Sequence, residues 1–470
     1  MYIPKYPLWF SKTLKQLILR KKIAHKVYKR YPTQYNYNQF SNIRAQCKSQ
    51  NKFDFNSFIS KTQNNIRTNP KSFWKFIANK RSNSTLPESM KYNNVNYSGG
   101  IDISNCFAQF FSSVFDQPNN RNVVSSIENI NMLSVDFNKC ILTLNDVYDE
   151  LNHVSIKTCP GPDAIPSIFF SECKFVLAVP LLYLFNLSLS SSVFPDKWKI
   201  TYISPIPIEG DNTQVTNYRP ISIISIIPKL FESVVSKKLN PIFKSIIIDE
   251  QHGFTTGRST TTNLLVFQCY VLDAFKAENQ VDVIYTNFSK AFDKIDHNIL
   301  TTKLYHLGLR NPFHSWLASF LTGRKQYVKI KNFSSSQYNV SSGVPQGSHI
   351  APLLFNMFIN DIKFANSRML LFADDLKLFR IIKTSNDAEL LQNDINVLCD
   401  WCNQNNLLLN ISKCKVLTFS RKRTPYLSNY YLNDSLLTRV YKNNDLGIIF
   451  DAFLSFNEHY LVFKTKLLLC

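Results

Sequence analysis

The sequence predicts an α+β fold, and three observations support that prediction. Between about residues 141 and 452, stretches with helical periodicity alternate with short β-rich stretches at 281–288, 326–330 and 369–379. In the last of these, two apolar runs flank an Ala-Asp-Asp sequence, which predicts a hairpin with two carboxylates at its tip. Apolar residues make up 44% of the chain and charged residues 19%, a balance typical of a globular protein with a packed core.

The charge of the chain indicates a partner that is rich in phosphate. The formal net charge is +21 over 470 residues, which favours nucleic acid or an anionic membrane surface. More than half of it comes from residues 1–50, which contain eleven Lys and Arg residues and no Asp or Glu. The abundance of Asn, Ile, Phe and Tyr leaves codon drift in an AT-rich gene open as a second source of lysine.

Cysteine usage and hydropathy indicate an intracellular protein. The ten cysteines form no disulfide framework, and the lone Cys399-x-x-Cys402 favours reduced thiols on an amphipathic helix over a structural metal site. The N-terminus lacks the apolar core of a secretory signal. The charge-poor run 175–195 contains Pro180 and Asn186, which favours a buried helix over a membrane span. We therefore expect a nuclear or cytoplasmic protein that is not secreted and has no membrane partner.

Residues 1–140 are predicted to form a basic helical extension. Helical patterns occur at 9–30, 70–81 and 103–115, and the polar stretch 82–100, which contains a Gly-Gly pair, predicts a linker. Binding of nucleic acid is the favoured role of 9–30, with binding to a membrane surface as the alternative. The chain ends inside an apolar helix without a cap, which we interpret as truncation.

Three segments carry the chemistry. They are VDVIYTNFSKAFDKIDH (281–297), a strand running into a helix; SSGVPQGSHIAPLLFNMFINDI (341–362), a loop opening a long helix; and LLFADDLKLF (370–379), the hairpin. Two adjacent acids between apolar strands are costly to bury unless a cation is bound there. Polymerases use such acids to hold two Mg²⁺ ions about 3.5–4 Å apart. An Asp pair alone is weak support, because turns often contain Asp.

Together these segments resemble motifs A, B and C of reverse transcriptases, most closely those of non-LTR (LINE-type, jockey-like) retrotransposons. A group II intron maturase is a more distant alternative, and the wording TNFSKAFDKIDH and GVPQGSHIAPLLF favours the retrotransposon branch. The resemblance covers nearly the whole chain in order and spacing. Its further matches are CPGPDAIP (159–166), NYRPISIISIIPKLFESVV (217–235), QHGFTTGRSTTTNLL (251–265), WLASFLTGRKQYVKI (316–330), LNISKCKVLTFSRKR (409–423) and DLGIIFD (445–451).

The resemblance implies a right-hand polymerase fold. Fingers and a palm with an antiparallel sheet are expected at 141–454, and the start of a thumb at 455–470. The implied activity is RNA-directed DNA polymerisation on an RNA template from a DNA primer, with dNTPs and two Mg²⁺ ions. The oligomeric state is left open.

The resemblance also implies the roles of individual residues. Asp374 and Asp375 match the metal ligands of motif C, and Phe292 matches the aromatic gate that selects dNTPs. Gln346 is expected near the incoming nucleotide and the template base, and Arg219 near the triphosphate.

A lysine of motif D is expected near the pyrophosphate, and Lys413 and Lys415 are both candidates. For each basic residue of the site, a solvated charge or a phosphate contact to the template is the alternative.

Position 287 is where the chain departs from the family. The family carries an aspartate there, and this chain has Asn287, so the site loses a negative charge and cannot clamp two ions as a carboxylate does. Asp282 lies roughly 16 Å away along an extended strand and on its opposite face. Asp293 and Asp296 follow in the next helix, where family members carry acids as well, so neither is expected to substitute. The site is thus either an impaired polymerase or a catalytically silent nucleic-acid-binding surface.

Other departures support the interpretation of a decayed or partial copy of an element. Glu209 replaces an expected basic residue, and Ala164 and Ala351 replace expected glycines, which is costly where φ is positive. The family's endonuclease has no counterpart, and the thumb is expected to be cut short after about Leu454.

Overall fold

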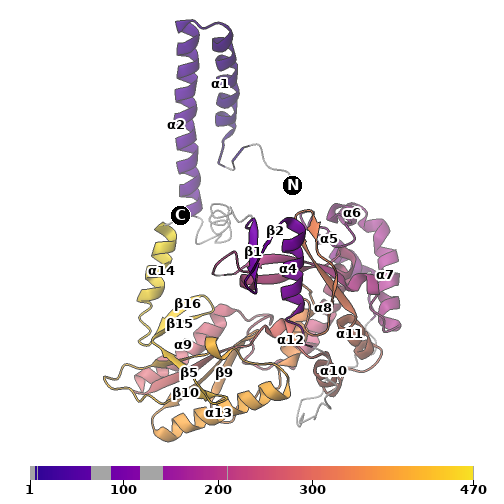
Figure 1. The fold of residues 1–470 in the computed structure, drawn as a ribbon, viewed down its shortest axis with the longest axis vertical. Helices are drawn as coiled ribbons and strands as arrows, with labels where there is room; N and C mark the ends of the chain where they lie inside the picture. The colour runs from indigo at the N-terminus through magenta and orange to yellow at the C-terminus, as the bar shows by residue number, and fades with distance from the viewer. Residues whose placement is uncertain (1–5, 8, 65–85, 117–140, 209, 469–470) are drawn as a thin grey trace. The chain divides into compact units, whose positions relative to one another are not determined.

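The computed structural model describes residues 6–7, 9–64, 86–116, 141–208 and 210–468, and side chains for all of these except 62–64 and 466–468 (Figure 1). The chain divides into two compact units, residues 1–86 with 465–470, and residues 87–464. This division falls well before the domain boundary expected at residue 141. Residues 87–116 therefore belong to the larger unit.

The smaller unit is a helical hairpin of α1 (Lys12–Arg30) and α2 (Gln34–Asn64), which pack against each other (Figure 1). The helix expected at 9–30 begins at Lys12 because Ser11 caps it, its side chain accepting a hydrogen bond from the backbone N–H of Leu14. It ends at Arg30, before Tyr31-Pro32, because the residue before a proline is disfavoured in the helical conformation. The helix expected at 70–81 lies outside the described residues.

Of the linker expected at 82–100, the described residues contain a β-hairpin over 89–98, and the helix expected at 103–115 is present at 100–112. Met90 is fully buried, and the ring of Tyr92 packs edge-on against Phe110. The Gly-Gly pair marks a helix start: Gly99 has a positive φ, and a Cβ at Gly100 would lie 2.1 Å from the Phe333 ring. The elements are β1 (Ser89–Tyr92), β2 (Val95–Ser98) and α4 (Gly100–Ser112).

One sheet and a set of helices form one part of the larger unit. The order of its strands is β4-β3-β6-β7, and β8 also pairs with β6. The strands are β3 (Ile200–Pro207), β4 (Tyr218–Ile223), β6 (Arg324–Ile330), β7 (Phe333–Ser334) and β8 (Tyr338–Val340). The helices are α5 (Leu144–Asn152), α6 (Ser167–Glu172), α7 (Lys174–Ser190), α8 (Ile226–Lys244), α10 (His297–His306), α11 (Phe313–Leu321) and α12 (Ala351–Phe358).

The charge-poor run 175–195 forms most of α7, and the prediction of a buried helix is correct for one face only. Phe185 is fully buried and stacks on Phe231 with 4.5 Å between ring centroids. Phe175 and Val176, by contrast, are exposed. Among the described residues, no helix is long and apolar enough to cross a bilayer.

The palm sheet has the order β14-β11-β5-β10-β9, with β5 at its centre. β5 pairs antiparallel with both β10 and β11, as expected for a palm, and β14 pairs parallel with β11. The strands expected at 281–288 and 369–379 are present within three residues of their predicted ends. The strands are β5 (Gln280–Asn287), β9 (Arg368–Phe372), β10 (Asp375–Ile382), β11 (Lys415–Phe419) and β14 (Thr438–Val440).

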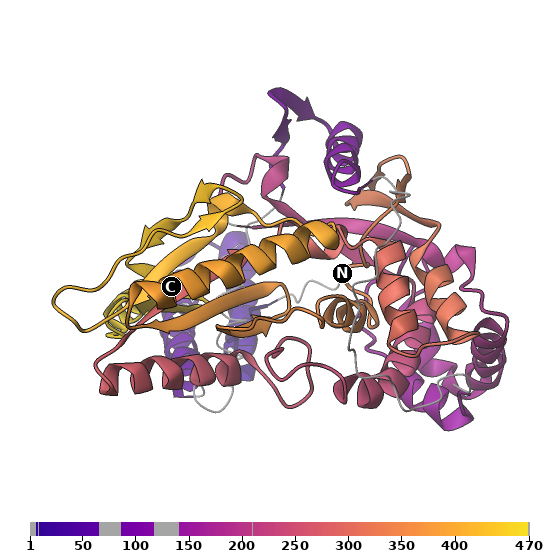
Figure 2. The ribbon, with the colours of Figure 1, turned by 90° about the horizontal axis from the view of Figure 1, so that it is seen from below.

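Two helices cover opposite faces of this sheet, α9 (Thr260–Lys276) and α13 (Ser385–Gln404) (Figure 2). Successive side chains of a strand point to opposite faces. In β5, Val281 and Val283 therefore pack in the cluster that contains α9, whereas Ile284 packs in the cluster that contains α13. This explains why β5 is buried along nearly its whole length.

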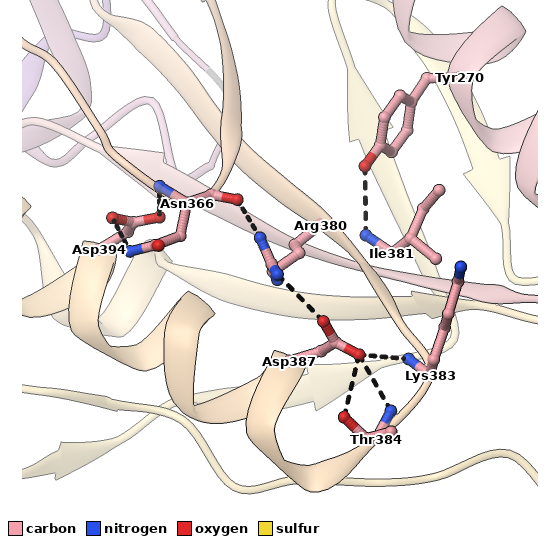
Figure 3. A network of polar contacts seen from close by, with 8 residues as sticks. All are labelled: Tyr270, Asn366, Arg380, Ile381, Lys383, Thr384, Asp387 and Asp394. Atoms are coloured by element: carbon pink, nitrogen blue, oxygen red, sulfur yellow. Dashed lines mark hydrogen bonds and ion pairs between the residues drawn. The ribbon is translucent and has the colours of Figure 1, made fainter.

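Polar contacts fix the end of β10 to both helices (Figure 3). Arg380 forms an ion pair with Asp387 at 3.0 Å, and Asp387 caps α13 by accepting hydrogen bonds from Thr384. On the other side, the backbone N–H of Ile381 donates to the hydroxyl of Tyr270 in α9 at 3.2 Å. These contacts limit sliding of β10 along its neighbours.

Short strands, 3₁₀ turns and the first part of one further helix complete the larger unit. That helix, α14, continues beyond Lys464, and its residues from Thr465 on are grouped with the smaller unit. The strands are β12 (Tyr431–Leu432), β13 (Ser435–Leu436), β15 (Lys442–Asp445) and β16 (Ile448–Asp451). The helix is α14 (Asn457–Leu468), and the 3₁₀ turns are η2 (Asp196–Lys199), η3 (Val215–Asn217), η4 (Ala291–Asp293) and η5 (Ile411–Lys413).

Truncation of Phe267 tests the packing of α9 on the palm sheet. Its ring is fully buried among Phe379, Phe419 and Phe450. We expect Phe267→Ala to lower the free energy of unfolding by about 3–5 kcal/mol, measured by urea denaturation. The matched control is Phe175→Ala at an exposed ring, with an expected change within about 0.5 kcal/mol. Equal effects of the two variants would contradict this packing.

Candidate active site

The carboxylate pair lies at the turn between β9 and β10, as the sequence predicts. The turn runs from Phe372 through Ala373 and Asp374 to Asp375. Ala373 has φ +55°, a left-handed conformation that is costly for a residue with a Cβ. Contacts elsewhere must therefore hold this turn in place.

Gln251 supplies these contacts from beneath the turn. Its buried side-chain oxygen accepts hydrogen bonds from the backbone N–H groups of Ala373 (3.0 Å) and Gly253 (2.7 Å). Its amide nitrogen lies 3.4 Å from the Ala373 carbonyl oxygen. Gly253 packs so closely that a Cβ there would lie 2.1 Å from the Ala373 nitrogen. The sequence reasoning did not identify Gln251 or Gly253 as parts of the site.

Asn287 lies directly opposite this turn. It ends β5 and pairs in register with Asp375 of β10. Its carbonyl oxygen accepts a hydrogen bond from the backbone N–H of Asn410 at 2.7 Å. The expected third ligand position is therefore beside the carboxylate pair, and it carries a neutral amide.

Burial raises the pKa of both carboxyl groups at the turn. For Asp374 burial is the main cause, and for Asp375 burial together with the charges of Asp374 and Asp445 raises the pKa to about 6. The charges of Arg219, near both groups, and of Lys377, near Asp375, oppose this rise only in part. Two adjacent carboxylates whose charges are only partly offset are suitable ligands for a divalent metal ion. Within the described ranges, however, no cluster of three acidic, His or Cys side chains is arranged to hold a metal.

A cavity of about 710 Å³ brings most of the predicted site residues together. Its lining includes Asn287, Asp374, Phe292, Gln346, Arg219 and Lys413. Asp375 is not part of that lining. Lys415 is not part of it either, and its Nζ donates to the Ser412 carbonyl at 3.0 Å.

Phe292 is fixed by other aromatic rings. It lies in η4 and stacks on Phe355 of α12, with 4.4 Å between ring centroids and 9° between the planes. Phe254 packs edge-on against it at 6.2 Å. The helix predicted after the motif B loop is shorter than expected, because α12 ends at Phe358. Just beyond it, the side chain of Asn360 accepts a hydrogen bond from the Ile248 N–H and donates one to the Ile246 carbonyl oxygen.

Gln346 is held at both its backbone and its side chain. Its carbonyl oxygen accepts a hydrogen bond from the Ser222 N–H at 2.9 Å, and its amide nitrogen donates to Oδ1 of Asp293 at 3.1 Å. The next residue, Gly347, has φ +122°, and a Cβ there would lie 2.6 Å from the Ser222 carbonyl oxygen. Only glycine is compatible with this close approach.

Asp293 is a second acid of the cavity, and it was not assigned a role from the sequence. Burial raises its pKa to about 6, and the hydrogen bond from Gln346 and the charges of Lys290 and Arg219 oppose that rise. Asp296 is not in the cavity lining, because its side chain caps α10. Asp282 is on the opposite face of β5, as predicted, where it accepts hydrogen bonds from Thr418 and Tyr430.

The end of α4 forms one wall of the cavity, which the sequence did not predict. Phe110 and Phe111 line it, and the ammonium group of Lys290 lies 4.2 Å from the Phe110 ring. Asp116 fixes this wall through an ion pair with Lys294 at 2.8 Å and a hydrogen bond from its backbone N–H to Ser342.

The other departures from the family pattern have different structural consequences. Ala164 has φ +58°, so a glycine would be favoured there, as the sequence predicted. Ala351 begins α12 with helical geometry, so no such cost applies. Glu209 lies outside the described residues.

Comparisons with known proteins give a family match for the central part of the chain. Residues 208–439 match the reverse transcriptase (RNA-dependent DNA polymerase) family. A probable RNA-directed DNA polymerase from transposon BS of Drosophila melanogaster is 28% identical over 332 residues, which is 68% of this chain and 36% of that protein. The polymerase of mobile element jockey from the same organism is 26% identical, over 69% of this chain and 37% of that protein. The chain thus spans little more than a third of the length of these relatives.

Among solved structures, apo telomerase from Candida Tropicalis aligns with 56% of this chain and 55% of its own, at 11% identity and a TM-score of 0.38.

Fold, site and family match define the class of this protein: residues 208–439 are a reverse transcriptase domain with the right-hand polymerase fold. More narrowly, it is a reverse transcriptase domain of the kind found in the jockey-like RNA-directed DNA polymerases of non-LTR retrotransposons. Polymerases of this class use divalent metal ions.

Removal of the Gln251 amide tests how the turn is held. In Gln251→Leu the N–H groups of Ala373 and Gly253 lose their buried acceptor, at a cost of roughly 1–3 kcal/mol for each group. We expect a loss of unfolding free energy of that order in urea denaturation. Gln404→Leu, at an exposed position on α13, is the control and should change little. An unchanged stability of Gln251→Leu would show that the turn does not depend on this contact.

The raised pKa of Asp293 predicts a pH-dependent stability. Between the unfolded pKa of about 3.9 and the folded value of about 6, the folded state holds the proton more tightly, so stability falls as pH rises through this window. We expect Asp293→Asn to remove this fall, which makes the variant about 2 kcal/mol more stable relative to the parent at pH 7 than at pH 4.

The measurement is urea denaturation at both pH values, with Asp273→Asn, at an exposed acid on α9, as the control. A stability difference between Asp293→Asn and the parent that does not change with pH would contradict the assignment.

Proposed function

We propose that the larger unit is an RNA-directed DNA polymerase that extends a DNA primer along an RNA template with dNTPs, and that Asn287 lowers its rate. The observation that carries this proposal is the cavity that gathers Asn287, Asp374, Gln346 and Arg219 from segments far apart in the sequence. In this assignment the fingers and palm span residues 141–454, together with the packed residues 87–116. Residues 455–470 are the start of the thumb.

Mg²⁺ is the proposed metal, and Asp374 and Asp375 would hold it. When bound, it would supply the positive charge that activates the primer 3′-hydroxyl and neutralises the leaving pyrophosphate. Asn287 offers one neutral carbonyl oxygen in place of a carboxylate. The protein's own ligands therefore carry one negative charge fewer than the family's set, so metal affinity is expected to be lower.

The remaining residues of the cavity would bind and orient the nucleotide. The exposed guanidinium of Arg219 and the ammonium of Lys413 would pair with phosphate oxygens, Arg219 in a bidentate manner. Phe292, fixed by its stack on Phe355, would occupy the space that a 2′-hydroxyl needs and so select dNTPs. Gln346 would contact the base pair being formed, its side chain oriented by Asp293.

A catalytically silent nucleic-acid-binding protein is the second candidate, and Asn287 is the observation that favours it. Loss of one preorganised electrostatic contact in a transition state costs about 10²–10³ in rate, and loss of a bridging carboxylate is expected to cost at least as much. The basic residues that would bind the template are unaffected by this substitution. The two candidates therefore differ in chemistry and agree in binding RNA.

Primer extension with Asn287→Asp separates the two candidates. We expect this variant to incorporate labelled dNTPs on an RNA template with Mg²⁺ at least about 10²-fold faster than the parent, because the third carboxylate is restored. Asn298→Asp, which adds the same charge at an exposed position on α10, should leave the rate unchanged. Asn287→Asp/Asp374→Asn should abolish extension, which would assign the activity to this site.

The other outcomes are equally decisive. Extension by the parent at a rate comparable to that of Asn287→Asp would show that another ligand completes the site. Template binding without extension by either chain would favour the silent nucleic-acid-binding protein.

A further inference from the structure

The tip of the helical hairpin exposes aromatic and cationic side chains side by side. This hairpin tip comprises residues 28–37, with the sequence YKRYPTQYNY, which joins the end of α1 to the start of α2. Tyr31 is 57% exposed and Tyr35 71% exposed, and Lys29 and Arg30 beside them are exposed as well. The guanidinium of Arg30 lies 5.7 Å from the centre of the Tyr31 ring. Large aromatic side chains are usually buried in packing, so their exposure at one end of a hairpin calls for an explanation.

The internal packing of the hairpin does not use these two rings. Tyr28 packs edge-on against Tyr37, with 5.5 Å between ring centroids, and stacks on Phe40 at 6.4 Å. These contacts join α1 to α2 just below the tip. Tyr31 and Tyr35 stay outside them, so their removal would leave the contacts between the helices intact.

Local hydrogen bonds fix the backbone that presents the exposed rings. The side-chain amide of Asn36 donates to the carbonyl oxygen of Tyr31 at 2.9 Å, and the Asn36 N–H donates to Oγ1 of Thr33 at 3.2 Å. Pro32 further restricts the chain between Tyr31 and Thr33. A backbone ordered in advance lowers the entropy lost on binding a ligand.

The charge of the hairpin calls for a polyanion. Helices α1 and α2 contain twelve Lys and Arg residues and one acid, Asp54. That carboxylate is 8% exposed and accepts hydrogen bonds from the Ser11 N–H at 3.0 Å and from Gln50 at 2.8 Å. Because Asp54 is buried and far from the tip in sequence, it does not offset the charge of Lys29 and Arg30. Exposed aromatic rings combined with unopposed cations match single-stranded nucleic acid, whose bases stack on rings while its phosphates pair with cations.

We propose that the hairpin tip binds single-stranded RNA, with bases stacked on Tyr31 and Tyr35 and phosphates paired with Lys29 and Arg30. This inference rests on the proposed function for the identity of the nucleic acid, and it adds an RNA contact outside the polymerase cavity. An anionic bilayer is the competing polyanion. Interfacial membrane helices bury a broad face of Trp, Phe and Leu side chains, and the tip presents polar tyrosines instead.

The first experiment locates the contact directly, because the polymerase cavity is also expected to bind RNA. The full chain is irradiated with a single-stranded RNA of about 16 nucleotides that carries 5-iodouridine, and crosslinked peptides are mapped by mass spectrometry. We expect crosslinks at Tyr31 or Tyr35, in addition to any within residues 87–464. Crosslinks confined to residues 87–464 would overturn the proposal.

Paired variants then separate stacking from charge. Tyr31→Ala/Tyr35→Ala should abolish the tip crosslink and weaken the RNA contact roughly 5-fold or more for each ring, whereas Tyr31→Phe/Tyr35→Phe should retain both. Lys29→Gln/Arg30→Gln should reduce the slope of log affinity against log salt by about 1.4, because two phosphate contacts are lost. Tyr441→Ala, at a ring that is 83% exposed in the larger unit, is the matched control.

The remaining outcomes distinguish this inference from the proposed function. Tip crosslinks without primer extension by Asn287→Asp would support RNA binding by the hairpin tip and contradict the proposed polymerase activity. Primer extension without tip crosslinks would support the polymerase activity and contradict RNA binding by the hairpin tip. Binding to phosphatidylserine vesicles that needs Tyr31 and Tyr35 and that RNA does not compete would assign the tip to a membrane and overturn the proposal.

Discussion

The register between β5 and β10 is the constraint on which the rest of the site depends. It places Asn287 beside Asp375, and a slip of one residue would turn the side chains of β5 to the opposite faces of the sheet. Apolar residues on both faces of β5 make such a slip costly, because α9 and α13 each receive a specific set of side chains. Gln251 adds a local anchor by bonding the strained Ala373. The sheet therefore fixes the position of the acids before any ligand binds.

That fixed position has an electrostatic cost which bears on Asn287. Desolvation already raises the pKa of Asp374 and Asp375, and Asp293 is a further, partly buried acid of the cavity. An aspartate at position 287 would add another carboxylate beside this group and raise the mutual repulsion in the absence of metal ions. Asparagine relieves that repulsion and at the same time weakens the hold on a cation. The substitution thus lowers the repulsion among the acids of the cavity in the metal-free fold.

The cavity is assembled from segments that lie far apart in the sequence. The end of α4 contributes Phe110 and is joined through Asp116 to Lys294 and Ser342, in the segments that follow motif A and precede the Pro-Gln-Gly loop of motif B. A change at Phe110 would thus alter the surroundings of Lys290, whose ammonium group lies 4.2 Å from that ring. Residues 87–116 are for this reason part of the larger unit and not a linker before it.

The sequence by itself determined the features that follow from local pattern. Strand periodicity located β5 and the carboxylate hairpin and placed Asp282 on the far face. The family motifs predicted that Asn287 stands where an acid is expected. Features that depend on long-range packing were out of reach. Gln251 lies 122 residues before Ala373, and a buried glutamine has no periodic signature that would reveal its partner. The burial that raises the pKa of Asp293 and the exposure of Tyr31 and Tyr35 were likewise decided only by tertiary structure, because both depend on which segments pack against them.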